Sequence, residues 1–149
     1  MNKLHLTHRL PLLLAFLIGS SLSLGQTSSS NAQQMEKWSK IAKRVTIHRD
    51  SYGVPHIYGP TDESVVFGYL YAQCEDNFWQ VEQNYILSLG RSAELAGPGA
   101  VPADVLVRAL EIPRLARQEY ATASPRIRQR CQATAAGINF YIATHPEAK

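Results

Sequence analysis

The sequence predicts an α+β fold in which one β-hairpin is followed by three or four helices. Residues 44–49 alternate apolar Val45 and Ile47 with polar neighbours, which is the period of a half-buried strand. A second short strand pattern returns at residues 54–58, and apolar residues then recur at helical spacing. The length of 149 residues, with 45% hydrophobic and 18% charged residues, is that of one folded domain of modest size.

The first 25 residues have the pattern of a secretory signal peptide. Lys3 and Arg9 come before an uncharged, mostly apolar run over residues 10–24, and small residues follow it. This run is shorter than the roughly 20 apolar residues that a membrane-spanning helix needs. We therefore expect cleavage after Gly25, with Ala32 as a later alternative. The protein is then periplasmic or secreted, with no membrane association after cleavage.

Residues 26–36 are expected to be a flexible lead-in, because their QTSSSNAQQ segment is polar and of low complexity. The folded part is then predicted to cover residues 37–149. Two cysteines, Cys74 and Cys131, are too few for a disulfide scaffold or a tetrahedral zinc site. An oxidising compartment allows them to pair, but both lie in predicted helices, where free buried cysteines are equally common. The sequence leaves that bridge open.

The predicted hairpin joins residues 44–49 to residues 54–58 through a short turn. The DSYG segment at residues 50–53 has turn chemistry, and Gly53 is free to take a positive φ. Pro55 has no backbone N–H to donate, so it suits an edge or the start of the second strand.

Two helical stretches are expected after the hairpin, with Thr61 or Asp62 capping the first. Their apolar faces are predicted to consist of Val65, Val66, Tyr69 and Leu70, and then of Phe78, Val81, Tyr85 and Leu89. Gly90 is expected to break or end the second stretch, because glycine is common where helices terminate.

The segment after Gly90 predicts more interrupted structure. The GPGAVP run at residues 97–102 is expected to be irregular. Asp104 is expected to cap a third helix that reaches Leu110, and Pro113 is expected to interrupt that helix.

The last helix has clear boundary signals. Ser124 followed by Pro125 is a strong helix start, and His145 with Pro146 is expected to end the helix. Its predicted apolar stripe consists of Ile127, Cys131, Ala135, Ile138 and Ile142. A two-stranded hairpin is only marginally stable alone, and helices beside it do not complete a layered domain. We therefore expect the chain to be a segment of a larger protein or one half of an assembly.

The charge distribution argues against nucleic-acid binding. The formal net charge is +3, but without Lys3 and Arg9 the remaining chain has 13 basic and 12 acidic residues. A local basic excess consists of Arg108, Arg114, Arg117, Arg126, Arg128 and Arg130. No aromatic stacking partners or recognised nucleic-acid motif accompany these arginines. We interpret them as a solvated helical surface or as partners of acidic residues elsewhere.

The hairpin contains a group of side chains capable of acid–base chemistry. His48, Asp50, Tyr52 and His56 fall on its strands and turn. We favour a structural interpretation, in which Asp50 makes hydrogen bonds in the turn and the histidines face solvent, because no nucleophile with a distinctive context lies nearby.

Three acidic residues, Glu75, Asp76 and Glu82, suggest either a metal site or salt bridges. Adjacent positions on a helix point about 100° apart, which is unsuited to joint ligation by Glu75 and Asp76. We therefore favour a helix-start or salt-bridge role for this group.

Four segments, in order, resemble the penicillin acylase (penicillin amidase) family. VTIHRDSYGVPHIYG at residues 45–59 resembles the family's opening hairpin, V-x-I-x-R-D-x-x-G-x-P-H-I-x-A, and GYLYAQCEDNFWQVE at residues 68–82 is similar to a helix that begins G-Y-x-x-A-Q. LGRSAELAG at residues 89–97 and ATAAGINFYI at residues 133–142 resemble two later blocks. The matching residues include Val45, Ile47, Arg49, Asp50, Gly53, Pro55, His56, Ile57, Gly68, Tyr69, Asp76, Gln80, Glu82, Gly137, Asn139 and Ile142.

The resemblance implies an amidohydrolase of the Ntn (N-terminal nucleophile) superfamily, with an αββα fold of which this chain is an incomplete piece. Such enzymes are exported precursors that cut themselves into a small α chain and a large β chain. The β chain begins with the nucleophile, usually a serine, and hydrolyses N-acyl amide bonds in penicillins, acyl-homoserine lactones or related acylated amines. Residues 37–149 correspond to the N-terminal part of the α chain.

The resemblance places the chemistry outside this chain. The nucleophile and the oxyanion hole belong to the β chain, and the α-chain residues that line the acyl pocket or help bind calcium are expected beyond Lys149. We therefore assign no catalytic, cofactor-binding or metal-binding residue to this sequence, and we expect the chain alone to be inactive. The expected partners are the β chain and a small-molecule acyl amide, with calcium in the full-length enzyme. The alternative is a secreted, non-catalytic helical binding module derived from this family.

Overall fold

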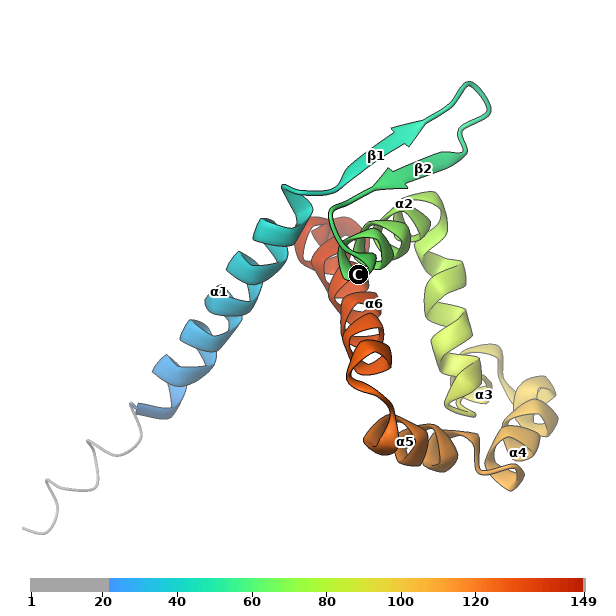
Figure 1. The fold of residues 1–149 in the computed structure, drawn as a ribbon. Coiled ribbons are helices and arrows are strands. Elements are labelled where there is room, and N and C mark those ends of the chain that lie inside the picture. The colour runs from blue at the N-terminus through green and yellow to red at the C-terminus, as the bar shows by residue number, and fades with distance from the viewer. Residues whose placement is uncertain (1–21, 149) are drawn as a thin grey trace, which may run out of the picture. The chain divides into compact units, whose positions relative to one another are not determined.

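The computed structural model describes residues 22–148 (Figure 1). The chain divides into two units, Met1–Lys37 and Trp38–Lys149. Within the first unit, the described residues belong to helix α1 (Leu22–Ala42), which continues into the second unit. The predicted signal peptide lies largely outside the described residues, and its cleavage site stays a prediction.

Residues 26–36 are helical, whereas the sequence predicted a flexible lead-in. The polar composition that suggested flexibility includes neither proline nor glycine within this range, so nothing interrupts the backbone hydrogen bonds. From Ala32 to Lys37 the segment is also rich in good helix formers, namely alanine, glutamine, methionine, glutamate and lysine.

The predicted hairpin is present as strands β1 (Thr46–Arg49) and β2 (Pro55–Tyr58), which pair antiparallel. Ile47 lies opposite Ile57 and is half-buried, while the neighbouring pair of His48 and His56 is exposed. Gly53 takes the expected positive φ of 81° in the turn. One hairpin followed by helices confirms the predicted α+β class.

Helix α2 (Asp62–Ser88) consists of two stretches separated by a kink at Asn77, where φ is −162° and ψ is 80°. Thr61 is the N-cap, and it forms a reciprocal capping box with Ser64. At the kink, Asn77 Oδ1 accepts a hydrogen bond of 3.2 Å from the backbone N–H of Gln80, as a cap does. This agrees with the two helical stretches that the sequence predicts.

The core lies mainly between α2 and α6 (Pro125–Thr144), which pack against each other (Figure 1). Its buried hydrophobic residues are Phe67, Ala72, Cys74, Val81, Ala133 and Ile138. Gly137 permits the close approach of the two helices, because a Cβ at this position would overlap the carbonyl oxygen of Phe67. Gly68 likewise permits the close approach of α2 to the hairpin, since a Cβ at this position would lie 2.5 Å from Val45 Cγ1.

The predicted apolar faces are only partly correct. Tyr69 and Tyr85 are each 48% exposed, and Ile127, Cys131 and Ala135 are exposed on α6. The helix faces in contact are instead centred on small residues, such as Gly68 and Gly137, at which backbones approach. The prediction is confirmed for Leu70, Phe78, Val81, Ile138 and Ile142, which lie in the core cluster or pack against it. Hydrophobic periodicity gives glycine little weight, so it did not indicate the two close backbone approaches.

Three short helices connect α2 to α6, and they differ from the prediction. They are α3 (Ala93–Ala96), α4 (Val101–Ala109) and α5 (Ile112–Thr122), with a 3₁₀ turn η1 (Pro98–Ala100) before α4. Residues 97–102 therefore contain a helical turn and a helix start, which their prolines permit at first-turn positions. The predicted interruption near Pro113 is present: α4 ends at Ala109 with Leu110 as its C-cap, and Pro113 lies in the first turn of α5, after Glu111 with φ of 53°.

Asp104 does not cap the helix that contains it. Its Oδ1 accepts a hydrogen bond of 2.7 Å from the N–H of Ser92, and its Oδ2 accepts one of 2.8 Å from the N–H of Ala93. The Asp104 carboxylate thus accepts hydrogen bonds from the backbone N–H groups at the start of α3, which lie 12 and 11 residues earlier in the sequence. Local capping rules do not reveal such a long-range contact.

The boundaries of α6 are those predicted. Ser124 is the N-cap and accepts a hydrogen bond from the N–H of Ile127, and His145 is the C-cap before the short turn η2 (Pro146–Ala148). Cys74 is buried and Cys131 is exposed, and both thiols are free. Among residues 22–148, no helix has the length and hydropathy to cross a membrane.

Candidate functional site

The histidines and aspartate of the hairpin form a turn, as the structural interpretation predicts. Asp50 Oδ1 accepts hydrogen bonds from the backbone N–H groups of Tyr52 at 2.9 Å and Val54 at 3.0 Å. Asp50 Oδ2 lies 3.3 Å from His56 Nε2, and the His48 and His56 rings are 6.5 Å apart. The hydrogen bond with His56 is the main reason that the pKa of Asp50 is lowered. This carboxylate therefore serves the turn and offers no free base.

Glu75 and Asp76 converge on one arginine that the sequence did not single out as their partner. Arg49 Nη2 lies 3.2 Å from Glu75 Oε2, and Arg49 Nη1 lies 2.8 Å from Asp76 Oδ1. Arg49 also donates a hydrogen bond of 3.0 Å to the carbonyl oxygen of Gly53. The predicted salt-bridge role is thus confirmed for Glu75 and Asp76, and Glu82 is exposed. Arg49 holds the hairpin against α2 immediately before the kink.

Part of the arginine excess pairs with an acid at the start of α2. Asp62 Oδ2 lies 3.0 Å from Arg126 Nη2 and 2.5 Å from Arg130 Nη2. The hydrogen bond from Arg130, which has the largest effect, and the hydrogen bond from Arg126 both lower the pKa of the Asp62 carboxyl. The pairs join α6 to α2, which agrees with a structural interpretation of these arginines.

A cluster of aromatic rings occupies the end of the core. Tyr71 packs edge-on against Tyr141 with ring centroids 5.7 Å apart, and Tyr141 stacks on His145 at 4.2 Å. Phe140 lies 5.9 Å from Tyr71 and 5.6 Å from Phe67. Desolvation raises the pKa of Tyr71 and of Tyr141. Such packing fixes the last turns of α6 on α2.

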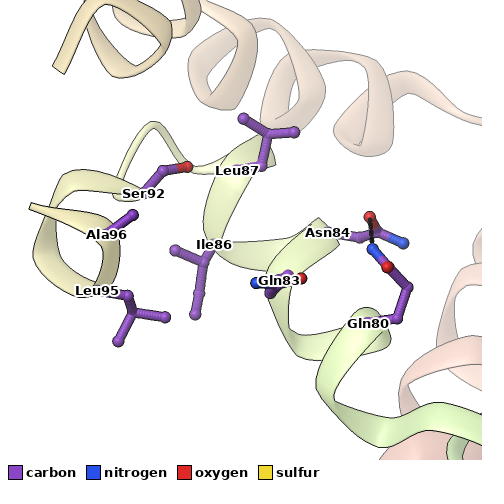
Figure 2. A pocket seen from close by; sticks show the side chains of 8 residues that line it. All are labelled: Gln80, Gln83, Asn84, Ile86, Leu87, Ser92, Leu95 and Ala96. Carbon is purple, nitrogen blue, oxygen red and sulfur yellow. Dashed lines mark hydrogen bonds between the residues drawn. The ribbon is translucent and has the colours of Figure 1, made fainter. Parts of the chain in front are cut away.

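Two adjoining surface depressions run along the second half of α2, and we call them together the amide groove. Both are lined by Gln80 and Asn84. The other lining residues are Gln73, Asp76, Asn77 and Val81 in one depression and Gln83, Ile86, Leu87, Ser92, Leu95 and Ala96 in the other. Figure 2 shows the second depression, with α2 on one side and Ser92 and α3 on the other. This row was not predicted from the sequence, although its members recur at helical spacing.

A third, more apolar depression lies where the hairpin meets α2. It is lined by Ala42, Val45, Ile47, Phe67, Gly68, Tyr71 and Phe140. Ala42 closes this depression at the end of α1, within the unit that begins at Trp38. No charged side chain lines this depression, so its surface resembles a part of the hydrophobic core that is left uncovered.

The helices α3, α4 and α5 expose large apolar side chains, which we call the apolar corner. Its members, each 43% to 60% exposed, are Leu95, Val105, Leu106, Leu110 and Leu115. Such exposure of large aliphatic residues is typical of surfaces that another protein covers. Within residues 22–148, no group of three histidine, cysteine or acidic residues is placed to hold a metal ion.

Comparison with known families matches residues 44–149 to the penicillin amidase family. The chain is 30% identical over 132 residues to an acyl-homoserine lactone acylase QuiP of Pseudomonas fluorescens, covering 84% of this chain and 16% of that protein. It is 33% identical to the penicillin acylase 2 proenzyme of a Pseudomonas species (strain SE83), covering 70% of this chain and 13% of the proenzyme. The chain thus spans less than a fifth of the length of these relatives.

A solved structure has a similar fold. The thermostable penicillin G acylase from Alcaligenes faecalis aligns with a TM-score of 0.62 and 30% sequence identity. The alignment covers 70% of this chain and 57% of that chain. Most of this chain is therefore similar in fold to part of a solved acylase.

Proposed function

This chain belongs to the penicillin amidase family, and we propose that it acts as the N-terminal part of the α chain of an exported acylase that hydrolyses N-acyl amide bonds. The observation that carries the proposal is a family match over residues 44–149 combined with a coverage of only 16% of the Pseudomonas fluorescens relative. A piece of this size supplies structure around an active site, and the reacting groups come from elsewhere in the protein.

The coverage values support a division of the precursor into chains. The aligned region takes up 57% of one chain in the solved Alcaligenes faecalis acylase but 13% of the Pseudomonas proenzyme. The solved chain is therefore several times shorter than the proenzyme. Separate small and large chains, cut from one exported precursor, account for this difference and complete the αββα fold between them.

The substrate class follows from the chemistry that the relatives' names share. An acyl-homoserine lactone and a penicillin both contain an acyl group joined to an amine through an amide bond. We assign to the whole enzyme the hydrolysis of that bond, which yields a carboxylic acid and an amine. The choice of acyl group belongs to residues outside the described part of the chain.

The reaction that this assignment requires uses a serine at the N-terminus of the β chain. Its hydroxyl oxygen attacks the amide carbonyl carbon, while its own α-amine takes the hydroxyl proton and passes it to the departing amine nitrogen. Water then attacks the ester carbonyl carbon, and the same α-amine takes a proton from this water and passes it to the departing serine oxygen, which releases the carboxylic acid and restores the serine. An α-amine has an ordinary pKa of about 7.7–8.0, so near neutral pH it is suited to this base role.

The described residues contribute positioning and no reacting group in this scheme. Arg49 fixes the hairpin on α2, and Asp104 fixes the corner of α3 and α4. In the described part of the chain, no three histidine, cysteine or acidic side chains gather as they would around a metal ion. The scheme routes no step through a metal, and the calcium ion that we expect in the full-length enzyme is assigned no ligand here.

The β chain of the same precursor is the partner that the apolar corner fits. Leu106 is 60% exposed and Val105 is 57% exposed, although both are large aliphatic residues on one short helix. Covering such side chains is favourable by roughly 25 cal/mol for each Å² of apolar surface removed from water. A large protein chain provides that cover, whereas a small-molecule substrate does not.

The proposal is tested by expressing the whole reading frame in a periplasm and analysing the product by intact mass and N-terminal sequencing. We expect two chains, the larger beginning with serine, and release of free amine from N-acyl-homoserine lactones or penicillins. Replacement of that serine by alanine should abolish release. A protein that is not cut and hydrolyses none of these amides would instead support the non-catalytic binding module.

A further inference from the structure

We propose that the amide groove binds an extended, uncharged peptide segment of the β chain, with side-chain carboxamides pairing with its backbone. This inference rests on the proposed function, since it names the surface on which that partner lies. The groove comprises the depressions along the second half of α2 that share Gln80 and Asn84.

Gln80 and Asn84 are paired in a way that leaves both acceptor and donor groups for a ligand. Gln80 Nε2 donates a hydrogen bond of 3.2 Å to Asn84 Oδ1, as Figure 2 shows. This bond fixes both carboxamides and leaves Gln80 Oε1 as an acceptor and Asn84 Nδ2 as a donor, neither of which has a partner among the described residues. A peptide unit presents one N–H and one C=O, which is the complementary pair.

The groove offers no unpaired charge. The depression drawn in Figure 2 is lined by eight residues, none of which ionises. In the adjoining depression, the single carboxylate is that of Asp76, which is already paired with Arg49 at 2.8 Å. A phosphate, a nucleic acid or a charged peptide would find no counter-ion in the groove, whereas a neutral backbone needs none.

One side of the groove is apolar. Leu87 is 46% exposed and Leu95 is 56% exposed, and they come from α2 and α3 respectively. An extended peptide alternates its side chains, so a segment whose backbone pairs with Gln80 and Asn84 can place an apolar side chain against these leucines. The eight residues that line the depression in Figure 2 include no aromatic ring on which a sugar would stack.

The β chain is the occupant to which these observations commit. The relatives' chains are more than five times longer than the region they share with this one, so most of their protein surface comes from other segments. The groove also ends at Leu95, a member of the apolar corner that the β chain is proposed to cover. One partner chain can therefore cover both surfaces continuously.

The test is site-specific photo-crosslinking in the whole precursor. A benzophenone amino acid replaces Gln83, which lines the groove, or Gln129, which is exposed on α6 and serves as the control. We expect irradiation to join position 83 to a peptide of the β chain, and mass spectrometry to identify an uncharged, extended segment. Position 129 should give no product with that segment. A crosslink to a second copy of this chain, to an unrelated protein, or to nothing would overturn the inference.

A matched pair of substitutions measures the contribution of the amides. Gln80→Met keeps side-chain length and helix propensity but removes the acceptor and the bond to Asn84, and Gln129→Met makes the same change at the control site. We expect about tenfold weaker association of the two chains for Gln80→Met, the effect of one lost buried hydrogen bond. Gln129→Met should remain within about twofold of the unchanged protein, since it removes no contact in the groove. Equal affinities for the two variants, at equal helix content by circular dichroism, would contradict the inference.

The two proposals fail in different ways. A precursor that yields no β chain and no amide hydrolysis overturns the proposed function, and the occupant of the groove with it. A precursor that matures and hydrolyses amides, but gives no crosslink at position 83 to the β chain, overturns the groove inference alone.

Discussion

Replacing Gly137 by alanine tests the close approach of α6 to α2. Gly137 lies on α6 where that helix crosses α2, and an added Cβ would overlap the carbonyl oxygen of Phe67 and lie 3.3 Å from Leu70 Cβ. The carbonyl is part of the α2 backbone, so it cannot rotate away as the end of a flexible side chain can. The two helices must separate to accommodate a single methyl group.

The expected effect combines two opposing contributions. Forcing a methyl group into a packed interface destabilises a protein by about 3 kcal/mol when the neighbouring group is rigid. Alanine is favoured over glycine within a helix by about 1 kcal/mol, which offsets part of this. The net loss is about 2 kcal/mol, and with an m-value of about 2 kcal/mol per M it lowers the urea midpoint by about 1 M.

Urea titration of the 149-residue chain at low protein concentration, followed by circular dichroism at about 222 nm, measures this shift. Gly99→Ala is the matched control, because Gly99 has no atom within 4 Å of its added Cβ and does not have a positive φ. Its midpoint should stay within about 0.3 M of the unchanged protein, given that an unstrained change of this kind alters stability by less than about 1 kcal/mol. If Gly137→Ala were as stable as Gly99→Ala, the described crossing of α2 and α6 would be wrong.

Three further predictions concern the hairpin, the α3 corner and the thiols. Arg49→Met removes two partly exposed ion pairs and should destabilise the chain by about 1 kcal/mol, with hydrogen exchange accelerated mainly in β1 and β2; uniform acceleration would argue against a local role. The N–H groups of Ala93 and Ser92 lower the pKa of Asp104, so its stabilising contribution is present above the pKa of an unfolded aspartate and is lost as pH falls through the lower folded pKa. Asp104→Asn should therefore lower the urea midpoint near neutral pH and much less in strong acid, whereas a gap independent of pH would contradict this. Burial raises the pKa of the Cys74 thiol to about 11, whereas Cys131 is exposed. In mildly alkaline buffer, one equivalent of a thiol reagent should therefore react, at Cys131, and in denaturant two equivalents should react. If no thiol reacted before reduction, the two cysteines would form a disulfide.

Local signals in the sequence predicted much of the fold. The alternation in residues 44–49 and the turn glycine indicated the hairpin, and Ser124 with Pro125 indicated the start of α6. Each of these features depends on residues within one turn or one strand pair, so no knowledge of the tertiary structure was needed.

The features that the sequence did not predict depend on distant contacts. Asp104 was expected to cap its own helix, but its carboxylate binds the start of α3. Gly137 and Gly68 determine where the helices and hairpin approach, although neither adds to a hydrophobic pattern. The pairing of Arg49 with Glu75 joins residues 26 positions apart in sequence. Only the tertiary structure brings such groups together.

The amide groove is a different case, because its signal was present in the sequence. Asn77, Gln80 and Asn84 recur three and four positions apart, which places them on one helical face. Motifs that indicate chemistry are built from titratable and nucleophilic side chains, and carboxamides are neither.

Amide hydrolysis by the chain alone and with its β chain is the measurement that most directly tests the proposed role. Purified chain should release no amine from an N-acyl-homoserine lactone or from a chromogenic N-acyl anilide, at any pH from mildly acidic to mildly alkaline. The same chain matured together with the β chain should hydrolyse at least one of these amides, with loss of activity when the β-chain serine is replaced. Turnover by the isolated 149-residue chain would contradict this division of roles, as would a matured pair that binds these amides but hydrolyses none of them.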